Sequence, residues 1–239
     1  MKAVILAAGY ATRLHPLTIN TSKCLLEIGG KPVISHLVEK LNELALEEII
    51  VVTNDRFYRD FLEWASIINS KNTIKIINDG STCNENRLGG IKDMLLAAEK
   101  FPAEKHLFIA GDNIFSFSLK EFFEEASRIN KPLIGVYDIG SLEKAKNFGV
   151  VQLENNKIIS FEEKPSMPKS TLISTLIYSI PNAKFYLEEF LNEEKNNNDA
   201  PGYFIKWLLN KTTCFAYVFS GKWYDIGNKE TLEEARLNF

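Results

Sequence analysis

The amino-terminal stretch constrains the fold more than any other part of this chain. An apolar run, KAVIL at residues 2–6, leads directly into a loop of small residues, AAGYA at residues 7–11. A buried strand that ends in such a loop is how α/β proteins bring backbone N–H groups close to phosphate. Arg13 adds a guanidinium fork that matches phosphate oxygens, and Lys23 adds a second cation. An ordinary turn with surface cations would explain Gly9 alone, but it does not explain this ordered set.

Composition narrows the class of protein. The 239 residues leave room for one sizeable core, and 45% hydrophobic with 25% charged residues is typical of globular proteins. A formal net charge of −3 gives no electrostatic reason to expect a nucleic-acid partner. No apolar run suits a membrane span or a signal peptide, and the scattered cysteines Cys24, Cys83 and Cys214 argue against disulfides or zinc. These features predict a cytoplasmic protein.

Strand and helix patterns alternate along the first part of the chain. Apolar residues at helical spacing predict helices at 32–44 and 57–68, and apolar β-branched runs predict strands at 48–53 and 73–77. This alternation indicates βαβ units and a largely parallel sheet. Ligands of such a sheet bind beyond the carboxyl ends of its strands.

The alternation of strands and helices ends after the fifth predicted strand, at residues 132–137. Residues 148–165 read as a hairpin with a tight polar turn, and the polar stretch 192–199 reads as a surface loop. The remaining elements that the sequence predicts are helices at 91–100, 119–128, 204–209 and 231–237 and strands at 106–110, 132–137, 170–180 and 213–219.

Two aspartates follow apolar strand patterns far apart in the sequence. Asp112 lies in GDNIF at residues 111–115, and Asp225 lies in WYDIG at residues 223–227. Mg²⁺ prefers hard oxygen ligands and commonly uses one or two carboxylates together with phosphate oxygens. On the residues alone, each aspartate could equally belong to a turn or to the start of a helix.

A family resemblance covers nearly the whole chain. AGYATRLHPLT at residues 8–18, followed by SK at 22–23 and KP at 31–32, resembles the signature of the sugar-phosphate nucleotidylyltransferases, with glucose-1-phosphate thymidylyltransferases as the nearest kin. The family pattern is close to G-x-G-T-R-L, so Ala11 stands where glycine is usual. The later motifs that match the family are GDNIF, FGVV at 148–151, EEKP at 162–165 and WYDIG.

The resemblance implies a fold and a division of the chain. The expected fold is a three-layer, Rossmann-like α/β nucleotidyltransferase fold. Its central sheet is mixed and mostly parallel, and it carries a small β excursion. Residues 1–239 are expected to form a single nucleotidyltransferase domain. Its nucleotide-binding half spans about 1–140, and its sugar-phosphate half spans about 141–239.

The resemblance also implies residue roles. Arg13, Lys23 and Asp112 are the expected catalytic residues, and Asp112 with Asp225 would hold Mg²⁺. The loop at 78–86 corresponds to a segment that reads the nucleotide base in the family. The residues expected to bind nucleotide are Leu6, Ala7, Ala8, Gly9, Thr12, Arg13, Asn78, Gly89 and Asp112.

A second set of residues corresponds to the sugar-phosphate side of the family's site. Glu163 matches a glutamate for sugar hydroxyls, and Lys164 matches a lysine for the sugar phosphate. Gly149 matches a glycine where the chain passes close to the sugar ring, and Thr175 completes this expected set. Leu176 departs from the family, which has a glycine at that position.

The implied reaction joins a sugar 1-phosphate to a nucleoside triphosphate, with glucose 1-phosphate and dTTP or UTP favoured. The expected partners are these two substrates, without nucleic acid or membrane, and a homo-oligomer is compatible with the sequence. One alternative is a CTP-dependent cytidylyltransferase for a non-sugar phosphate such as phosphocholine. Another is a non-catalytic regulator that binds nucleotide-sugar. A Rossmann dehydrogenase is disfavoured because the opening loop lacks G-x-G-x-x-G.

Overall fold

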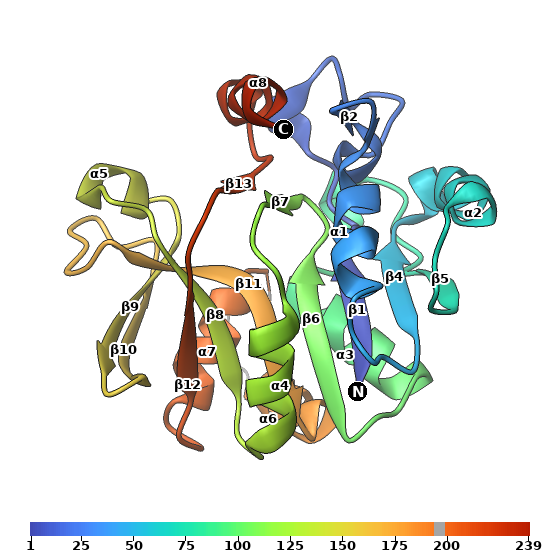
Figure 1. Ribbon diagram of the computed structural model, residues 1–239. Coiled ribbons are helices and arrows are strands. Elements are labelled where there is room, and N and C mark those ends of the chain that lie inside the picture. The colour runs from blue at the N-terminus through green and yellow to red at the C-terminus, as the bar shows by residue number, and fades with distance from the viewer. Residues whose placement is uncertain (194–198) are drawn as a thin grey trace. The chain divides into compact units, whose positions relative to one another are not determined.

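The computed structural model describes residues 1–193 and 199–239 and divides into two compact units (Figure 1). The first unit contains residues 1–88, 109–119 and 221–239, and the second contains residues 89–108 and 120–220. Each unit is thus assembled from separate stretches of the chain. The division into halves near residue 140 stays a prediction. Among the described residues, no helix has the length and hydrophobicity that crossing a membrane requires.

A parallel sheet of three neighbouring strands forms the centre of the first unit. Strand β4 (Ile49–Thr53) lies between β1 (Lys2–Leu6) and β5 (Ile74–Asn78), and both pairings are parallel. The crossovers contain the helices α1 (Val33–Leu41) and α2 (Tyr58–Ile67), as the periodicity predicts. Every residue of β4 is buried, which is why its sequence is apolar almost throughout.

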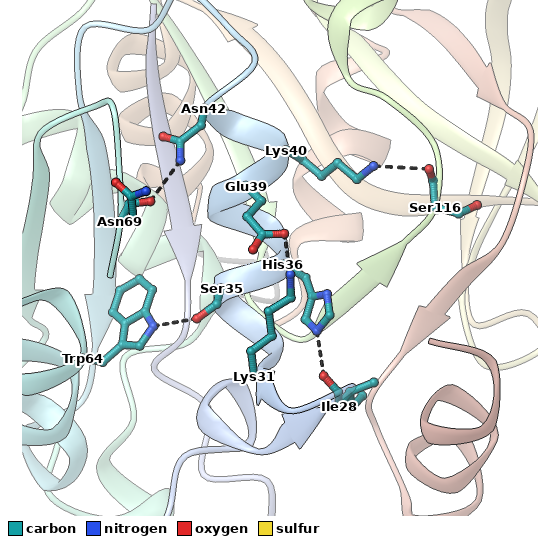
Figure 2. A network of polar contacts seen from close by, with 10 residues as sticks. All are labelled: Ile28, Lys31, Ser35, His36, Glu39, Lys40, Asn42, Trp64, Asn69 and Ser116. Carbon is teal, nitrogen blue, oxygen red and sulfur yellow. Dashed lines mark hydrogen bonds and ion pairs between the residues drawn. The ribbon is translucent and has the colours of Figure 1, made fainter. Parts of the chain in front are cut away.

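Helix α1 packs through its buried apolar face. Hydrogen bonds of polar side chains also hold it against its surroundings (Figure 2). Trp64 Nε1 donates to Ser35 Oγ at 2.9 Å, and His36 Nε2 lies 2.8 Å from the Ile28 carbonyl oxygen. Lys40 Nζ donates to the carbonyl oxygen of Ser116 at 3.3 Å. This last contact joins α1 to the segment that follows Asp112.

Short elements complete the first unit. Strand β7 (Asn113–Phe115) pairs antiparallel with β13 (Trp223–Asp225), green beside red in Figure 1, and α8 (Lys229–Asn238) follows β13. A buried cluster joins these elements to the amino-terminal loop and contains Leu14, Ile28, Val33, Ile114, Ile226, Leu232 and Ala235. The other short elements are η1 (Thr12–Leu14), η2 (Lys23–Leu25), β2 (Glu27–Ile28), β3 (Lys31–Pro32), η3 (Asp55–Phe57) and η4 (Asn84–Asn86).

The second unit combines antiparallel and parallel strand pairs. Strand β8 (Leu133–Asp138) pairs parallel with β12 (Phe215–Phe219) and antiparallel with β11 (Leu172–Pro181). The expected hairpin is formed by β9 (Gly149–Glu154) and β10 (Lys157–Glu163). Parallel and antiparallel pairs therefore both occur, which confirms a mixed sheet. Strand β6 (Lys105–Ala110) begins in the second unit, and its last two residues belong to the first.

The sequence reasoning missed two helices of the second unit, the four-residue α5 (Leu142–Ala145) and the longer α6 (Ala183–Asn192). In α6, Ala183, Leu187 and Phe190 are buried and lie at helical spacing, so the signal was present. Of the predicted surface loop at 192–199, residues 194–198 lie outside the described residues. The other helices of this unit are α3 (Gly90–Lys100), α4 (Lys120–Arg128) and α7 (Pro201–Leu208).

Candidate active site

The two aspartates expected to hold metal are neighbours in the first unit. Asp225 ends β13 and pairs across the strands with Asn113, the residue after Asp112. The N–H of Ile226 donates to the carbonyl oxygen of Asp112 at 3.0 Å. The antiparallel pairing of β7 with β13 therefore brings residues 112 and 225 together.

Lys23 lies beside this pair and is ion-paired with the Asp112 carboxylate. The side chains of Lys23 and Asp112 are only 21% and 13% exposed. Burial opposes the charge on Lys23, but the Asp112 and Asp225 carboxylates outweigh it and raise the pKa of this amine above its usual value. Burial likewise opposes ionisation of Asp112, and the Lys23 charge outweighs it and lowers the pKa of the carboxyl. Each group thus keeps the other charged.

Gly111 allows the Asp112 segment to approach strand β1 closely. Its N–H donates to the carbonyl oxygen of Leu6 at 2.9 Å. A Cβ at residue 111 would lie 3.0 Å from both this oxygen and Cys24 Sγ, closer than side-chain carbons ordinarily come. A larger residue would push Asp112 away from the start of the small-residue loop.

The small-residue loop itself is held by backbone contacts and by a buried asparagine. Ala7 N–H donates to the Val52 carbonyl oxygen at 2.8 Å, and Asn54 Nδ2 donates to the Ala8 carbonyl oxygen at 2.9 Å. Gly9 is exposed, and a Cβ there would lie 3.9 Å from Lys23 Cε. The loop therefore lies next to Lys23. Sequence reasoning did not single out Asn54, whose position after β4 was the available signal.

Thr12 and Arg13 lie on η1, and both are exposed, while the next residue, Leu14, is buried. Ala11, just before η1, has φ 48° and ψ 44°, which is the left-handed conformation. Its carbonyl oxygen accepts from Thr18 Oγ1 at 2.8 Å. Glycine adopts this conformation without strain, so the structure gives a backbone reason for the glycine that is usual at position 11.

The residues expected near the base, Asn78 and Gly89, lie in different units. The Asn78 side chain donates to Asp55 Oδ1 at 2.7 Å and accepts from the Gly80 N–H at 2.8 Å. Its amide therefore organises the loop after β5. Gly89 precedes α3 with φ 88°, a conformation that favours glycine.

In the second unit, the hairpin brings two of the expected sugar-side residues together. Glu163, at the end of β10, is the cross-strand partner of Gly149, at the start of β9. Lys164 follows at once, exposed and with φ 46°, and its N–H donates to the Phe148 carbonyl oxygen at 3.1 Å. The local fold therefore places the carboxylate and the amine at one end of the hairpin.

Burial sets the electrostatics of Glu163. It raises the pKa of this carboxyl above its usual value, and the Lys164 charge offsets part of that rise. Burial also raises the pKa of the Tyr178 phenol, with a smaller contribution from the Glu163 charge. Tyr178 Oη lies 2.7 Å from Ser174 Oγ. A buried phenol and hydroxyl therefore lie within the electrostatic reach of Glu163.

Thr175 is buried, and its hydroxyl donates to the Gly135 carbonyl oxygen at 3.0 Å, so this side chain secures β11 to β8. The register of these strands shifts between Ser174 and Tyr178, and Leu176 within that break has φ 54°. Both departures from the family's glycines, Ala11 and Leu176, thus have left-handed backbone. A left-handed backbone therefore gives a conformational reason for the glycine that the family has at position 176.

The two adjacent carboxylates fit a magnesium ion. Among residues 1–193 and 199–239, no group of three or more histidine, cysteine, aspartate or glutamate side chains could hold a metal. A site rich in protein ligands, as zinc requires, is therefore not found there. Asp112 and Asp225 instead match the one or two carboxylates that Mg²⁺ uses when substrate phosphates and water complete its shell.

Comparison with known proteins places the chain in a family. The family model described as nucleotidyl transferase matches residues 2–239, and the chain belongs to this family. It is 30% identical over 236 residues to the bifunctional protein GlmU of Methanocaldococcus jannaschii, covering 98% of this chain and 53% of that protein. It is 28% identical to a glucose-1-phosphate adenylyltransferase of Clostridium novyi, covering 100% of this chain and 66% of the relative. The chain spans about half the length of the bifunctional relatives that it matches.

Solved structures confirm the expected fold. A Bacillus anthracis crystal structure assigned as a glucose-1-phosphate thymidylyltransferase superposes with a TM-score of 0.81 at 26% identity, covering 100% of this chain and 94% of that one. A UDP-glucose pyrophosphorylase complexed with UDP-glucose gives a TM-score of 0.85 at 23% identity, covering 99% and 97%. The latter likeness shows the fold alone. Together they confirm the mixed α/β nucleotidyltransferase fold.

Proposed function

We propose that this protein condenses a sugar 1-phosphate with a nucleoside triphosphate to give a nucleotide-sugar and pyrophosphate. The observation that carries the proposal is the arrangement of Asp112, Asp225 and Lys23 beside the small-residue loop at residues 7–11. A triphosphate can be bound by backbone N–H groups, by a cationic side chain and by a metal ion that two carboxylates hold.

The reaction needs no protein nucleophile, because a phosphate oxygen of the sugar 1-phosphate attacks the α-phosphorus and pyrophosphate departs. The protein therefore contributes positioning and neutralisation of charge. Lys23 would hold the phosphate that is transferred, and the exposed Arg13 would bind the departing pyrophosphate through its guanidinium fork. Asp112 and Asp225 would hold Mg²⁺, which when bound supplies charge neutralisation to the phosphates.

On the sugar side, Glu163 would accept hydrogen bonds from sugar hydroxyls, and Lys164 would bind the sugar phosphate. Their adjacent positions at the end of β10 support this pairing of roles. Gly149, the cross-strand partner of Glu163, would lie nearest the ring. The buried Thr175 would act through the sheet rather than by contact, because its hydroxyl is bonded to Gly135.

Glucose 1-phosphate with dTTP or UTP is the substrate pair that the sequence motifs favour. The name of the Bacillus anthracis protein supports glucose 1-phosphate and a thymidine nucleotide. The Clostridium novyi relative is named as an adenylyltransferase, so ATP is the main competitor for the nucleotide site.

A substrate matrix tests this function. Purified protein would be incubated with Mg²⁺, each of dTTP, UTP, ATP and CTP, and glucose 1-phosphate, other sugar 1-phosphates or phosphocholine. Pyrophosphate release is the readout. We expect turnover with glucose 1-phosphate and a pyrimidine nucleotide, and its loss in EDTA. Turnover only with CTP and phosphocholine would show a cytidylyltransferase that does not act on sugar phosphates. Binding of nucleotide-sugar without any turnover would indicate a non-catalytic regulator.

A further inference from the structure

The carboxylate of Glu163 lies against the backbones of two glycines, Gly149 and Gly202. A Cβ built on Gly202 would overlap Glu163 Oε2, and one built on Gly149 would lie 3.1 Å from the same atom. The aromatic ring of Phe161 flanks the same space, since it would crowd a Cβ at either glycine. We call the space bounded by Gly149, Phe161 and Gly202 the carboxylate slot.

The side of the slot formed by Gly202 is firmly fixed. Gly202 is buried in the first turn of α7, directly after Pro201. Pro201 packs on Gly90, where an added Cβ would lie 2.9 Å from Pro201 Cγ, and the Gly90 N–H donates to the Asp199 carbonyl oxygen at 3.2 Å. Further along α7, the fully buried Phe204 has its ring centroid 5.7 Å from that of Phe190. Helix α7 therefore cannot move easily away from Glu163.

The two glycines differ in what a methyl group would displace. At Gly149 it would strike the buried ring of Phe161, which is part of the core. At Gly202 it would strike the carboxylate at the free end of a flexible side chain. Alanine at 149 should therefore damage packing, because its Cβ would lie 2.4 Å from Phe161 Cζ. The Cβ of alanine at 202 would lie 3.1 Å from Phe161 Cε1, so this alanine should chiefly turn Glu163 out of the slot.

Helix propensity does not explain why residue 202, in the first turn of α7, is a glycine. Alanine is the better residue in a helix, because glycine loses more backbone freedom on folding. Gly202 has an α-helical setting and no left-handed backbone that would favour glycine. The close approach of Glu163 Oε2 accounts for its presence.

We infer that Gly202 is a positioning residue, which holds the Glu163 carboxylate in the orientation that recognises the hydroxyl groups of the sugar 1-phosphate. This inference rests on the proposed function and extends it, because none of the sugar-side motifs includes residue 202. A carboxylate fixed by shape accepts hydrogen bonds at a defined angle, which favours one arrangement of hydroxyls over another.

The experiment is a cycle of Gly202→Ala and Glu163→Ala, with Lys206→Ala as an exposed control on the same helix. Gly202→Ala should raise the KM for glucose 1-phosphate about tenfold to a hundredfold, the range for losing a charge-assisted contact. The KM for the nucleoside triphosphate should change less than about twofold, and the melting temperature should fall less than in Gly149→Ala, whose methyl group lies closer to the Phe161 ring. Lys206→Ala should leave all three values unchanged.

The double variant gives the decisive comparison. In the Glu163→Ala background, Gly202→Ala should have no further effect on the KM, because the carboxylate that it displaces is absent. A further rise of the KM there would overturn the inference, as would a normal KM in Gly202→Ala alone. If Gly202→Ala fails to fold, the double variant should fold, and its failure to do so would contradict the slot.

These outcomes are separate from the fate of the proposed function. Wild-type protein without turnover on any substrate pair would refute nucleotidyl transfer itself. Normal turnover and a normal sugar KM in Glu163→Ala would retain the activity and remove both Glu163 and Gly202 from the sugar site. Partial recovery of Gly202→Ala by Glu163→Asp, whose shorter side chain leaves room for the methyl group, would support the slot.

Discussion

Asp112 in the first unit and Glu163 in the second are both partly buried carboxylates, but they are held by different means. Asp112 is ion-paired with Lys23, and the charge of Lys23 lowers its pKa despite burial. Glu163 lies in a slot between glycines, and burial raises its pKa despite Lys164. The first carboxylate is fixed by opposite charge, and the second is fixed by shape.

Under the proposed function, the difference suits two kinds of ligand. A metal ion and a triphosphate need charge, and charged groups that already compensate one another can stay ionised while they are buried. A sugar is neutral at its hydroxyls, so its recognition depends on the direction of hydrogen bonds. Substitutions that change charge should therefore act most strongly in the first unit, and those that change shape should act most strongly in the second.

The largest effect is expected from Asp225→Asn. The amide keeps the shape of the side chain and removes its charge, while Lys23 keeps its ion pair with Asp112. Turnover should fall at least about a hundredfold, because neutralisation of phosphate by a bound metal contributes several kcal/mol. Pyrophosphate release at saturating substrates measures this. Near-normal turnover would remove Asp225 from the metal site.

Asp112→Asn should cause a similar loss of turnover and also a loss of stability. It removes the ion-pair partner of the largely buried Lys23 amine and leaves only the Asp225 charge nearby, so the loss should be no larger than the roughly 3–5 kcal/mol for breaking a buried ion pair. Urea denaturation would measure the free energy of unfolding, with Asp225→Asn as the matched control. Equal stability of the two variants would contradict the assigned role of the ion pair.

Lys164→Ala should act on the sugar side alone. Removing this exposed amine should weaken glucose 1-phosphate binding by about 1–3 kcal/mol, the usual contribution of a charge-assisted contact. Affinity for the nucleoside triphosphate, measured separately by calorimetry, should stay the same. Weaker binding of the nucleoside triphosphate alone would overturn the proposal that Lys164 binds the sugar phosphate.

Ala11→Gly should raise stability slightly, by about 0.5–1 kcal/mol, because it relieves a left-handed backbone. Leu176→Gly relieves a similar backbone but also removes a half-buried side chain, so it should gain less. The free energy of unfolding of both variants tests this comparison. A loss of stability in Ala11→Gly would show that the loop tolerates alanine without strain.

The smallest effect concerns pH and Glu163. Because its pKa is raised in the folded state, the folded protein binds more protons than the unfolded chain just above the usual value of 4.5. The contribution of Glu163 to stability should therefore decrease as pH rises through that region. Glu163→Gln should flatten the dependence of the free energy of unfolding on pH there. An unchanged slope would place Glu163 in water.

Much of the fold could be predicted from sequence because its strands and helices have clear apolar periods. The strand ending at Thr53 and the helix beginning near Pro32 are examples, and their existence depends on local pattern. The helix containing Leu187 was missed although its apolar period is helical, because it follows a strand directly and has no side-chain cap that would mark its start.

Less of the candidate site than of the fold could be predicted from the sequence. Asp112 and Asp225 could be singled out by motif, but their adjacency depends on the pairing of β7 with β13, two strands of three residues with little pattern. Gly202 had no signal at all, because its significance comes from a side chain that is distant in sequence. Contacts of that kind are fixed by tertiary packing, which local patterns do not encode.

The interleaving of the first unit has a consequence for synthesis of the chain on the ribosome. Residues 89–108 and 120–220 emerge before residues 221–239, so the second unit can pack while β13 and α8 of the first are still missing. Until then the nascent chain carries Asp112 without Asp225, and the buried cluster around Leu14 lacks Leu232 and Ala235. Closing this unit requires a contact across more than a hundred residues, so its final folding step should be late and slow.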